Sequence, residues 1–429
     1  MMFNKLIYIL GRNFRNPSLK KQFLFLKESE KWSLKKLEAY QLDKLKELVS
    51  FAYSNSTYYK NKLDEIKLHP SEIIELNDLK KLPVLTKQDI LKHTDSIHTK
   101  HSFKKKFKAI TSGTTGNSLV FQREEHADSF NRASINRGYS WYEINPWDKN
   151  GYFWGFNFSL TKKIKTIVLD KLQNRFRVFS YENKSFSNFV NKLETAKYIH
   201  GYSSMIYQTA KLINDKNLKK PKNIKMVKGT SEKIFDNYHD EVKRAFGIKI
   251  ISEYGATESG IIAFECPEGN MHINMEGVIV EEIDHEILVT NLQMQSFPII
   301  RYKLGDYIKL ASRDKKCSCG KNHLIIEEVT GRIGKNVYGK ENIYPSLYFY
   351  YIFKNLEHNH NIKLNYQIIQ KEKGELLFKF DRKISDNERK LVSLEIKKYF
   401  NTDVYFTISD AVEIKSDGGK LKSFISKIN

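Results

Sequence analysis

The sequence is poor in cysteine and has no long apolar run. Only three cysteines occur among its 429 residues, which excludes the disulfide framework of a small secreted protein. No stretch approaches the roughly 20 apolar residues that a transmembrane helix needs. The apolar start of the chain, residues 1–10, is too short to span a bilayer and is followed by basic residues without a signal-peptide cleavage site. We therefore expect a cytoplasmic protein.

Acidic residues are scarce relative to basic ones. The chain has 72 Lys and Arg against 50 Asp and Glu, a formal net charge of +22, and such an excess suits nucleic acid, anionic lipid or acidic substrates. The lysines are scattered in pairs and triplets, such as 104–106, and no nucleic-acid recognition motif is present. We therefore expect a solvated lysine-rich surface and no nucleic-acid partner. The segment from Phe3 to Leu26 mixes apolar and basic residues; ordinary packing is the preferred interpretation, and peripheral contact with an anionic membrane is the alternative.

The first two thirds of the chain change from a helical to an alternating pattern. Apolar residues recur at near-helical spacing over 33–54, behind a possible Ser33 cap, and Thr86 begins another helix. From about 198 to 252, short apolar runs alternate with helical stretches, one of them expected over 232–246, and Gly247 stands where that helix should end. This alternation favours a parallel sheet covered by helices. At 50.4 kDa the chain is also long enough for two domains.

The last third favours strands first and a small α+β unit afterwards. Residues 271–310 read as strands around a turn at 284–285, which indicates a small antiparallel or barrel-like section. Strands are then expected at 364–370, 375–380 and 404–408, and a helix is expected from Ser385, whose Glu388 completes a capping box.

Hydroxyls and glycines alternate in the segment 111–119, Thr-Ser-Gly-Thr-Thr-Gly-Asn-Ser-Leu. The glycines let backbone N–H groups turn toward an anion, and the hydroxyls add neutral donors. The lysine of a Walker A loop is missing and a strand, 119–122, follows in place of a helix, which excludes a P-loop NTPase. The segment is typical of a polyphosphate-binding loop; an ordinary surface turn is the alternative. Its candidate phosphate ligands are Thr111, Ser112, Gly113, Thr114, Thr115 and Gly116.

Two further segments follow the loop in order, Glu-Tyr-Gly-Ala-Thr-Glu at 253–258 and Arg-Tyr-Lys-Leu-Gly-Asp at 301–306. Together they resemble the core motifs of the adenylate-forming superfamily, and within it the branch similar to phenylacetate-CoA ligase and to CapK of capsular polysaccharide biosynthesis. The resemblance covers nearly the whole chain and implies an α/β fold, with a large AMP-binding domain at 1–331 and a small, mobile α+β lid at 332–429. Further matching segments are 82–87, 200–204, 331–332 and 418–420.

The resemblance implies a role for each residue of an ATP site. The loop would wrap the β- and γ-phosphates, Thr257 would contact the α-phosphate, and Glu258 would help to hold Mg²⁺, a cation that prefers carboxylate oxygen. Tyr254 would lie along the adenine ring, and Asp306 would accept hydrogen bonds from the ribose hydroxyls. Taken singly, each of these residues has an ordinary structural explanation. The remaining nucleotide contacts would come from Gly229, Ser231, Glu232, Gly255 and Arg332.

The C-terminal segment Ser-Asp-Gly-Gly-Lys at 416–420 resembles the family segment whose lysine reaches into the adenylation site. A compact ammonium suits the charge that develops between the carboxylate and the α-phosphate. Lys420 is therefore the candidate catalytic lysine, with Lys422 as the rival assignment and a disordered basic terminus as the alternative. Arg301 is open to either a structural or a functional role.

All three cysteines lie beside motifs of the predicted large domain, and a histidine lies near the first of them. Four soft or borderline ligands of this kind favour tetrahedral zinc, and phenylacetate-CoA ligase-like proteins resemble this pattern. Four filled positions leave none for catalysis, so the zinc would be structural. Unrelated buried thiols are the alternative. The candidate ligands are Cys266, His272, Cys317 and Cys319.

The chain departs from the family pattern at several positions. Asn117 and Ser118 stand where Lys-Pro is common, and Gly334 and Lys335 stand where an Asp-Asp pair is common. The second change removes an expected hinge carboxylate and bears on how a small domain would swing between half-reactions. By position, the acyl pocket would draw on 151–158 and 202–204, an aromatic-rich wall that suits an apolar or aryl acid.

These features predict an ATP-dependent ligase that activates a carboxylate as an acyl-adenylate and passes the acyl group to a thiol, with CoA as one candidate, or to an amine. The amine of a surface-polysaccharide sugar or amino acid is suggested only by the CapK-like resemblance. The alternative is a nucleotide-binding scaffold or sensor of the same fold without turnover.

Overall fold

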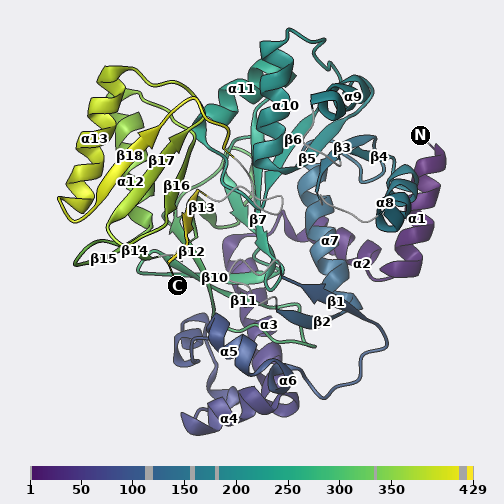
Figure 1. Ribbon diagram of the computed structural model, residues 1–429. Helices are drawn as coiled ribbons and strands as arrows, with labels where there is room; N and C mark the ends of the chain where they lie inside the picture. Colours follow the sequence, from purple (N-terminus) through teal and green to yellow (C-terminus); the bar gives the residue numbers. More distant parts are fainter. Residues whose placement is uncertain are drawn as a thin grey trace. The chain divides into compact units, whose positions relative to one another are not determined.

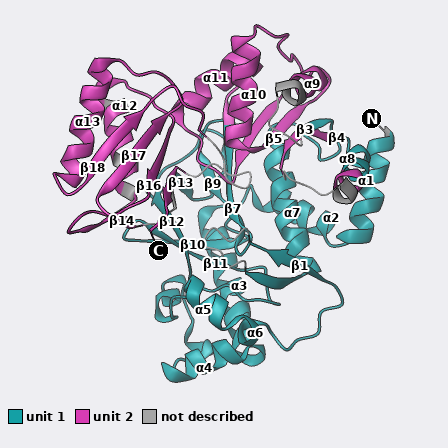
Figure 2. Cartoon of the chain, viewed as in Figure 1, with its two compact units in different colours: residues 1–150, 167–175, 251–329 teal, residues 151–166, 176–250, 330–429 magenta. Residues whose placement is uncertain are grey.

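The structure, a computed structural model, describes residues 2–111, 119–154, 160–178, 183–332, 336–414 and 423–428. Helices and strands are mixed along the chain, as the sequence predicts (Figure 1). They form two compact units (Figure 2): unit 1 comprises residues 1–150, 167–175 and 251–329, and unit 2 comprises 151–166, 176–250 and 330–429. The division into domains at residue 332 stays a prediction.

Unit 1 begins with helices and continues into an antiparallel sheet. Its strands follow the order β10-β11-β12-β13-β9-β8-β7, and a separate hairpin pairs β1 with β2. The helices are α1 (Met2–Arg15), α2 (Leu19–Ser29), α3 (Leu34–Asn55), α4 (Thr57–Glu65), α5 (Lys87–Lys92), α6 (Thr94–Ile97) and α7 (Glu125–Ser140), with short 3-10 turns at Pro70–Glu72 and Leu76–Lys81. The strands are β1 (Lys106–Ile110), β2 (Val120–Glu124), β7 (Ile250–Ala256), β8 (Gly260–Glu265), β9 (Met271–Ile273), β10 (Val278–Ile283), β11 (Glu286–Asn291), β12 (Tyr302–Leu310) and β13 (Ile325–Arg332).

Local sequence signals set the ends of several elements in unit 1. The Ser33 hydroxyl accepts a hydrogen bond from the Lys36 amide at 3.3 Å and begins α3, and Thr86 and Asp89 form a capping box at α5. Asp284 and His285, both with positive φ, make the tight turn between β10 and β11, as two-residue hairpins require. Each of these signals was predicted, and the β10 to β12 section is antiparallel.

Helix α7 lies against β8 through a glycine. A Cβ at Gly138 would lie 2.5 Å from the ring of Phe264, which is buried. Only a residue without a side chain allows this approach. The contact places α7, which carries several buried polar residues discussed below, directly on the sheet.

Unit 2 contains a parallel strand pair and a second small sheet. Strands β5 and β6 pair in parallel, with His200 opposite Lys228, as the alternating pattern predicts. In the order β18-β17-β16-β19, the small sheet has an antiparallel β16–β17 pair and two parallel edge pairs. The elements are β3 (Asn150–Phe153), β4 (Arg175–Arg177), α9 (Asn183–Leu193), β5 (Tyr198–Tyr202), α10 (Ser203–Asp215), β6 (Met226–Thr230), α11 (Asp236–Phe246), β14 (Asn336–Tyr338), β15 (Ile343–Pro345), α12 (Leu347–His360), β16 (Tyr366–Gln370), β17 (Glu375–Phe380), α13 (Asp386–Phe400), β18 (Tyr405–Ser409) and β19 (Phe424–Ser426), while α8 (Leu160–Leu172) spans the boundary between the units.

Two of the predicted helix ends in unit 2 are confirmed, and one predicted helix start differs from the structure. Gly247 ends α11 with a φ of 77°, and Ser385 and Glu388 form the capping box of α13. Helix α11, expected from Glu232, begins only at Asp236. The reason is local, because Phe235 has an extended backbone, with φ −82° and ψ 154°, and therefore ends the helix on its N-terminal side.

The core of unit 2 joins segments from both sides of residue 332. Phe235 lies edge-on to Tyr366 with ring centroids 5.6 Å apart, and both belong to one buried apolar cluster. Among the described residues, no helix is both long and apolar enough to cross a bilayer.

Candidate active site and metal cluster

The glycine-rich loop is the connection of the β1–β2 hairpin, and Thr111 closes its base. The Thr111 amide donates to the Leu119 carbonyl at 2.9 Å, and the Leu119 amide donates to the Thr111 hydroxyl oxygen at 3.0 Å. Ile110 and Val120 are the last paired residues before the loop. The other predicted phosphate ligands, Ser112 to Gly116, and the departures at Asn117 and Ser118 lie outside the described residues. Thus both ends of the loop are held by β structure.

Two predicted nucleotide ligands far apart in sequence meet in unit 1. Tyr254 on β7 donates from its hydroxyl to the Asp306 carboxylate on β12 at 2.8 Å. Gly305, just before the aspartate, has a φ of 81°, a conformation that glycine adopts at little cost. The hydrogen bond fixes the orientation of the carboxylate. The Tyr254 ring therefore lies beside a carboxylate that can accept hydrogen bonds from hydroxyl groups, as expected for an adenine and ribose site.

The turn between β7 and β8 carries Thr257 and Glu258. Gly255 fits there because a Cβ would lie 2.5 Å from the Gly260 carbonyl oxygen. The Tyr302 hydroxyl lies 3.5 Å from a carboxylate oxygen of Glu258, at the limit of hydrogen bonding. The turn is therefore tight, and the carboxylate that would hold Mg²⁺ is near β12, the strand of Asp306.

Arg123 ties the glycine-rich hairpin to this turn, a role that the sequence did not reveal. It lies on β2 and donates from Nη2 to the Thr257 carbonyl. Burial lowers the pKa of Arg123, against an opposing effect of Asp128, whose Oδ1 is 3.8 Å from Nη1. No motif marks this arginine; only the partner 134 residues later in the chain gives it a role. Arg123 thus positions the backbone of Thr257 relative to β2.

The predicted opposite wall of the adenine site lies in unit 2. The Glu232 carboxylate accepts a hydrogen bond from the Ser204 amide at 2.8 Å, and the Ser203 hydroxyl donates to the Glu232 carbonyl at 3.3 Å. A Cβ at Gly229 would lie 2.5 Å from the Ser203 hydroxyl oxygen. The 229–232 segment is therefore held by the turn that begins α10, part of the 200–204 motif.

The remaining predicted positions are described only in part or not at all. Arg332 is the last residue of β13, but its side chain lies outside the description. Lys420 and its rival Lys422 lie outside the described residues, as do Gly334 and Lys335. Their roles stay predictions.

Arg301 has a structural role. Its guanidinium makes two 3.0 Å contacts with the Glu281 carboxylate and donates to the Leu82 carbonyl at 2.6 Å. The side chain is buried, and a paired, fully hydrogen-bonded arginine is the form in which such burial is tolerated. The Leu85 amide donates to the Arg301 carbonyl at 3.0 Å. The 82–87 motif and the start of the 301–306 motif are thereby joined.

Aromatic side chains of β3, β5 and Trp154, the residue after β3, stack where the acyl pocket was expected. Trp154 stacks on Tyr202 with centroids 4.7 Å apart and planes 16° apart. Tyr152 stacks on His200 with centroids at 4.4 Å, and the Arg177 guanidinium lies 4.9 Å from the Tyr152 centroid. Residues 155–158 of the expected wall lie outside the described residues. The described part of the wall is thus an aromatic surface, with the Arg177 guanidinium over the Tyr152 ring.

The predicted metal ligands form a compact cluster in unit 1. The donor atoms of Cys266, His272, Cys317 and Cys319 all lie within 4.8 Å of one another. The sulfurs of Cys266 and Cys317 are 3.6 Å apart, and Cys319 Sγ is 3.2 Å from His272 Nε2. Tetrahedral zinc with bonds of about 2.3 Å needs sulfurs about 3.7 Å apart. Burial lowers the pKa of His272 to about 4, which leaves the neutral imidazole that a metal requires. The donor set fits zinc.

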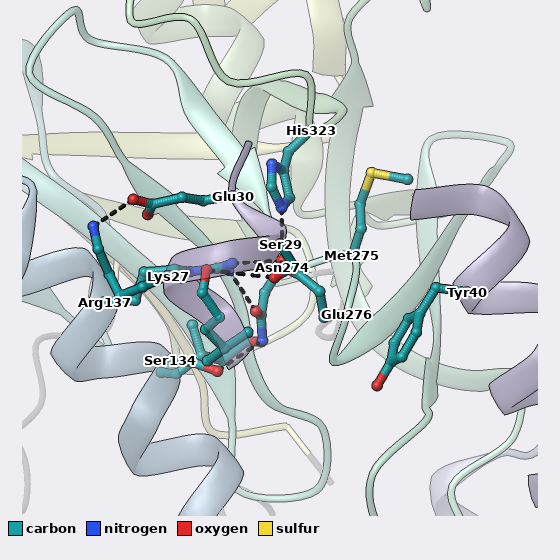
Figure 3. A network of polar contacts seen from close by, with 12 residues as sticks. Lys27, Ser29, Glu30, Tyr40, Ser134, Arg137, Asn274, Met275, Glu276 and His323 are labelled. Carbon is teal, nitrogen blue, oxygen red and sulfur yellow. Dashed lines mark hydrogen bonds and ion pairs between the residues drawn. The ribbon is translucent and has the colours of Figure 1, made fainter. Parts of the chain in front are cut away.

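A buried network of polar groups lies next to this cluster (Figure 3). His272 Nδ1 is 3.3 Å from the His323 carbonyl oxygen, and the His323 ring contacts Glu276 at 3.0 Å. Glu276 also contacts Arg137 of α7 at 2.7 Å and accepts a hydrogen bond from Ser29 of α2. Burial by itself would raise the pKa of Glu276, but Arg137 and His323 hold it well below its usual range. The network links the cluster to two helices.

Replacing Glu276 with glutamine is expected to destabilise the protein by about 3 kcal/mol, because it leaves Arg137 buried without its counter-charge. A carboxyl with a lowered folded-state pKa adds stability above its unfolded value, 4.5, and this stability is lost as pH falls below that value. Denaturant unfolding between pH 7 and 3 should therefore show a shallower acid loss in Glu276→Gln. The control Glu28→Gln, at an exposed site on α2, should follow the wild type; identical acid slopes for both variants would contradict this account.

The fold is similar to those of two solved enzymes, a CoA ligase and an acyl acid amido synthetase. The structure of 2-hydroxyisobutyryl-CoA ligase in complex with 2-HIB-AMP matches it with a TM-score of 0.71 at 15% identity, covering 93% of this chain and 92% of that one. The acyl acid amido synthetase AtGH3.15 in complex with 2,4-DB matches with a TM-score of 0.62 at 12% identity, covering 96% and 94%.

Two curated sequences are similar to the chain. Protein CapK of Staphylococcus aureus is 25% identical over 281 residues, which are 63% of this chain and 62% of CapK. Phenylacetate-coenzyme A ligase of Escherichia coli K12 is 41% identical over 58 residues, which are 14% of this chain and 13% of that ligase. No protein-family model matches the sequence. These findings confirm the resemblance drawn from the motifs.

Proposed function

We propose that the protein is an ATP-dependent ligase that activates a carboxylic acid. The observation that carries the proposal is the Tyr254–Asp306 hydrogen bond in a fold of the adenylate-forming type. It joins the predicted adenine platform to the predicted ribose acceptor, two motifs that have no local reason to meet. In the reaction, a carboxylate oxygen of the acid attacks the α-phosphorus of ATP and pyrophosphate leaves.

The site residues support this chemistry by positioning and by charge. The loop anchored at Thr111 offers backbone and hydroxyl donors to the β- and γ-phosphates. Glu258 is a hard oxygen ligand suited to Mg²⁺, and Arg123 holds the neighbouring Thr257 in place. Lys420 supplies the positive charge for the transition state.

The acyl group is then passed to a thiol or an amine. The similar solved structures include a CoA ligase and an amido synthetase, which supports a thiol and an amine as the two candidate acceptor classes. CoA is the thiol candidate, and the CapK-like resemblance adds an amine of a surface polysaccharide. The stacked Tyr152, Trp154 and Tyr202 favour an apolar or aryl acid as substrate.

Zinc is proposed for the cysteine and histidine cluster. The four donors would fill a tetrahedral shell, so the metal would stabilise unit 1 without taking part in the reaction. The His323 carbonyl would orient His272 through its second ring nitrogen, the usual arrangement for a histidine ligand.

Replacing Asp306 with asparagine is expected to raise the KM for ATP about tenfold or more in acid-dependent exchange of pyrophosphate into ATP, since a hydrogen bond to a charged group is worth about 1.5–3 kcal/mol. Tyr254→Phe should have a smaller effect in the same direction, because it frees the carboxylate to move. The control is Asp284→Asn in the β10–β11 turn, which should leave the KM unchanged. An unchanged KM for ATP in Asp306→Asn would show that Asp306 does not bind the ribose.

A nucleotide-binding protein without turnover is the second candidate. Gly334 and Lys335, where a hinge carboxylate pair is expected, favour it. It predicts that ATP binds by calorimetry while no acid stimulates exchange. Exchange with any acid would exclude it.

A further inference from the structure

Helix α1 presents a stripe of four large apolar side chains to solvent. The exposed fractions are 72% for Phe3, 54% for Leu6, 61% for Leu10 and 85% for Phe14. At 3.6 residues per turn these side chains fall within an arc of about 80° of the helix. The sequence favoured ordinary packing for this segment, and the structure leaves this face uncovered.

The opposite face of α1 is attached to the rest of unit 1. Asn136 of α7 donates to the Tyr8 hydroxyl at 2.9 Å, and the Tyr8 ring lies 5.5 Å from that of Trp147. Tyr8 is about half a turn away from the stripe. The helix is therefore docked on one side, and its exposed stripe is not the result of a detached terminus.

The stripe belongs to a basic segment of the chain that has no acidic residue. No Asp or Glu occurs between residues 2 and 27, while six basic residues do. Lys105 of the chain segment before β1 donates to the Phe14 carbonyl at 2.6 Å, and its ammonium lies 5.2 Å from the Phe14 ring. The basic residues of the segment are Lys5, Arg12, Arg15, Lys20, Lys21 and Lys27.

A second helix also exposes several large apolar side chains. In the part of α8 that belongs to unit 1, Ile167, Val168, Leu169 and Leu172 are all exposed, with fractions between 38% and 53%. Of the exposed large apolar side chains found among the described residues, nine lie on α1 and α8. Soluble proteins rarely gather such side chains without a binding partner.

We propose that α1 docks on an anionic lipid surface, with Phe3, Leu6, Leu10 and Phe14 at the boundary of headgroups and acyl chains. Apolar residues on one face of a helix that otherwise carries only positive charge are typical of interfacial helices. A second copy of this chain would bring two acid-free, basic segments together, and like charges oppose such an interface. Anionic headgroups complement them.

The test is flotation of the full-length protein with vesicles of phosphatidylcholine alone or mixed with phosphatidylglycerol. The stripe variant changes Phe3, Leu6, Leu10 and Phe14 to serine. A matched control changes four other exposed apolar residues to serine: Ile66, Ile74, Ile283 and Leu394. Sedimentation of the same proteins without vesicles reports self-association, and circular dichroism confirms folding.

The wild type and the control should float with the mixed vesicles, more weakly at high salt, and the stripe variant should bind at least about tenfold less tightly. Binding to neither kind of vesicle would overturn the proposal, as would equal binding to both kinds or an equal loss in the control. A wild-type dimer that the stripe variant abolishes, without any vesicle binding, would assign the face to a second copy instead.

Discussion

Replacing Lys420 with alanine is expected to slow acyl-adenylate formation about 100- to 1,000-fold, the usual cost of removing one group that stabilises transition-state charge. In the proposed reaction, negative charge develops between the incoming carboxylate and the α-phosphate, and a lysine ammonium is a compact counter-charge. The lysine is placed by the sequence of the segment 416–420, so the prediction tests that assignment directly. ATP affinity should change little, since the proposal assigns ground-state binding of ATP to the loop, Tyr254 and Asp306.

The matched control is Lys422→Ala, two residues further on. It removes the same charge from the same C-terminal segment, so a general effect of charge would lower both rates alike. Single-turnover formation of AMP-linked acid, followed with saturating ATP, separates the two lysines. A large loss of rate in Lys422→Ala with a normal rate in Lys420→Ala would make Lys422 the catalytic lysine. Normal rates in both variants would show that neither lysine takes part in the reaction.

Replacing Cys317 and Cys319 together with serine is expected to abolish zinc binding and to lower the melting temperature by about 10 °C. Thiolates are the ligands that zinc holds most strongly in such a site, and the free energy of binding a structural metal is free energy of folding. The four ligands come from the chain between the end of β8 and the start of β13 and form one cluster. Loss of the metal should therefore destabilise this part of unit 1 most.

Metal analysis of the purified protein should find about one zinc per chain in the wild type and none in the double variant. The control is Ser318→Ala, which lies between the two cysteines and donates only to Glu268 at the surface. It should retain both zinc and stability. A wild type without metal, or a double variant with unchanged melting temperature, would contradict the zinc assignment.

Local sequence rules predicted the parts of the fold that local interactions determine. The caps at Ser33, Thr86 and Ser385 and the glycine at 247 each depend on residues within one helical turn. The parallel β5–β6 pair follows from alternating helical and apolar segments. The meeting of Tyr254 and Asp306 was implied only by the motif resemblance, since 52 residues separate them.

The sequence did not reveal the contacts that depend on tertiary packing. Arg123 and the Glu276 network join residues over 100 positions apart, and no spacing rule connects them. The exposed stripe of α1 has the same pattern of apolar residues that a packed helix would have. Only the structure distinguishes the two, because exposure depends on what the rest of the chain covers.

The central claim, that this protein activates a carboxylic acid with ATP, is tested most directly by exchange of labelled pyrophosphate into ATP across a panel of aryl, fatty, hydroxy and amino acids. The proposal predicts exchange that depends on one class of acid and on magnesium, and that is lost in Lys420→Ala. No exchange with any acid, from folded protein shown to bind ATP, would contradict it.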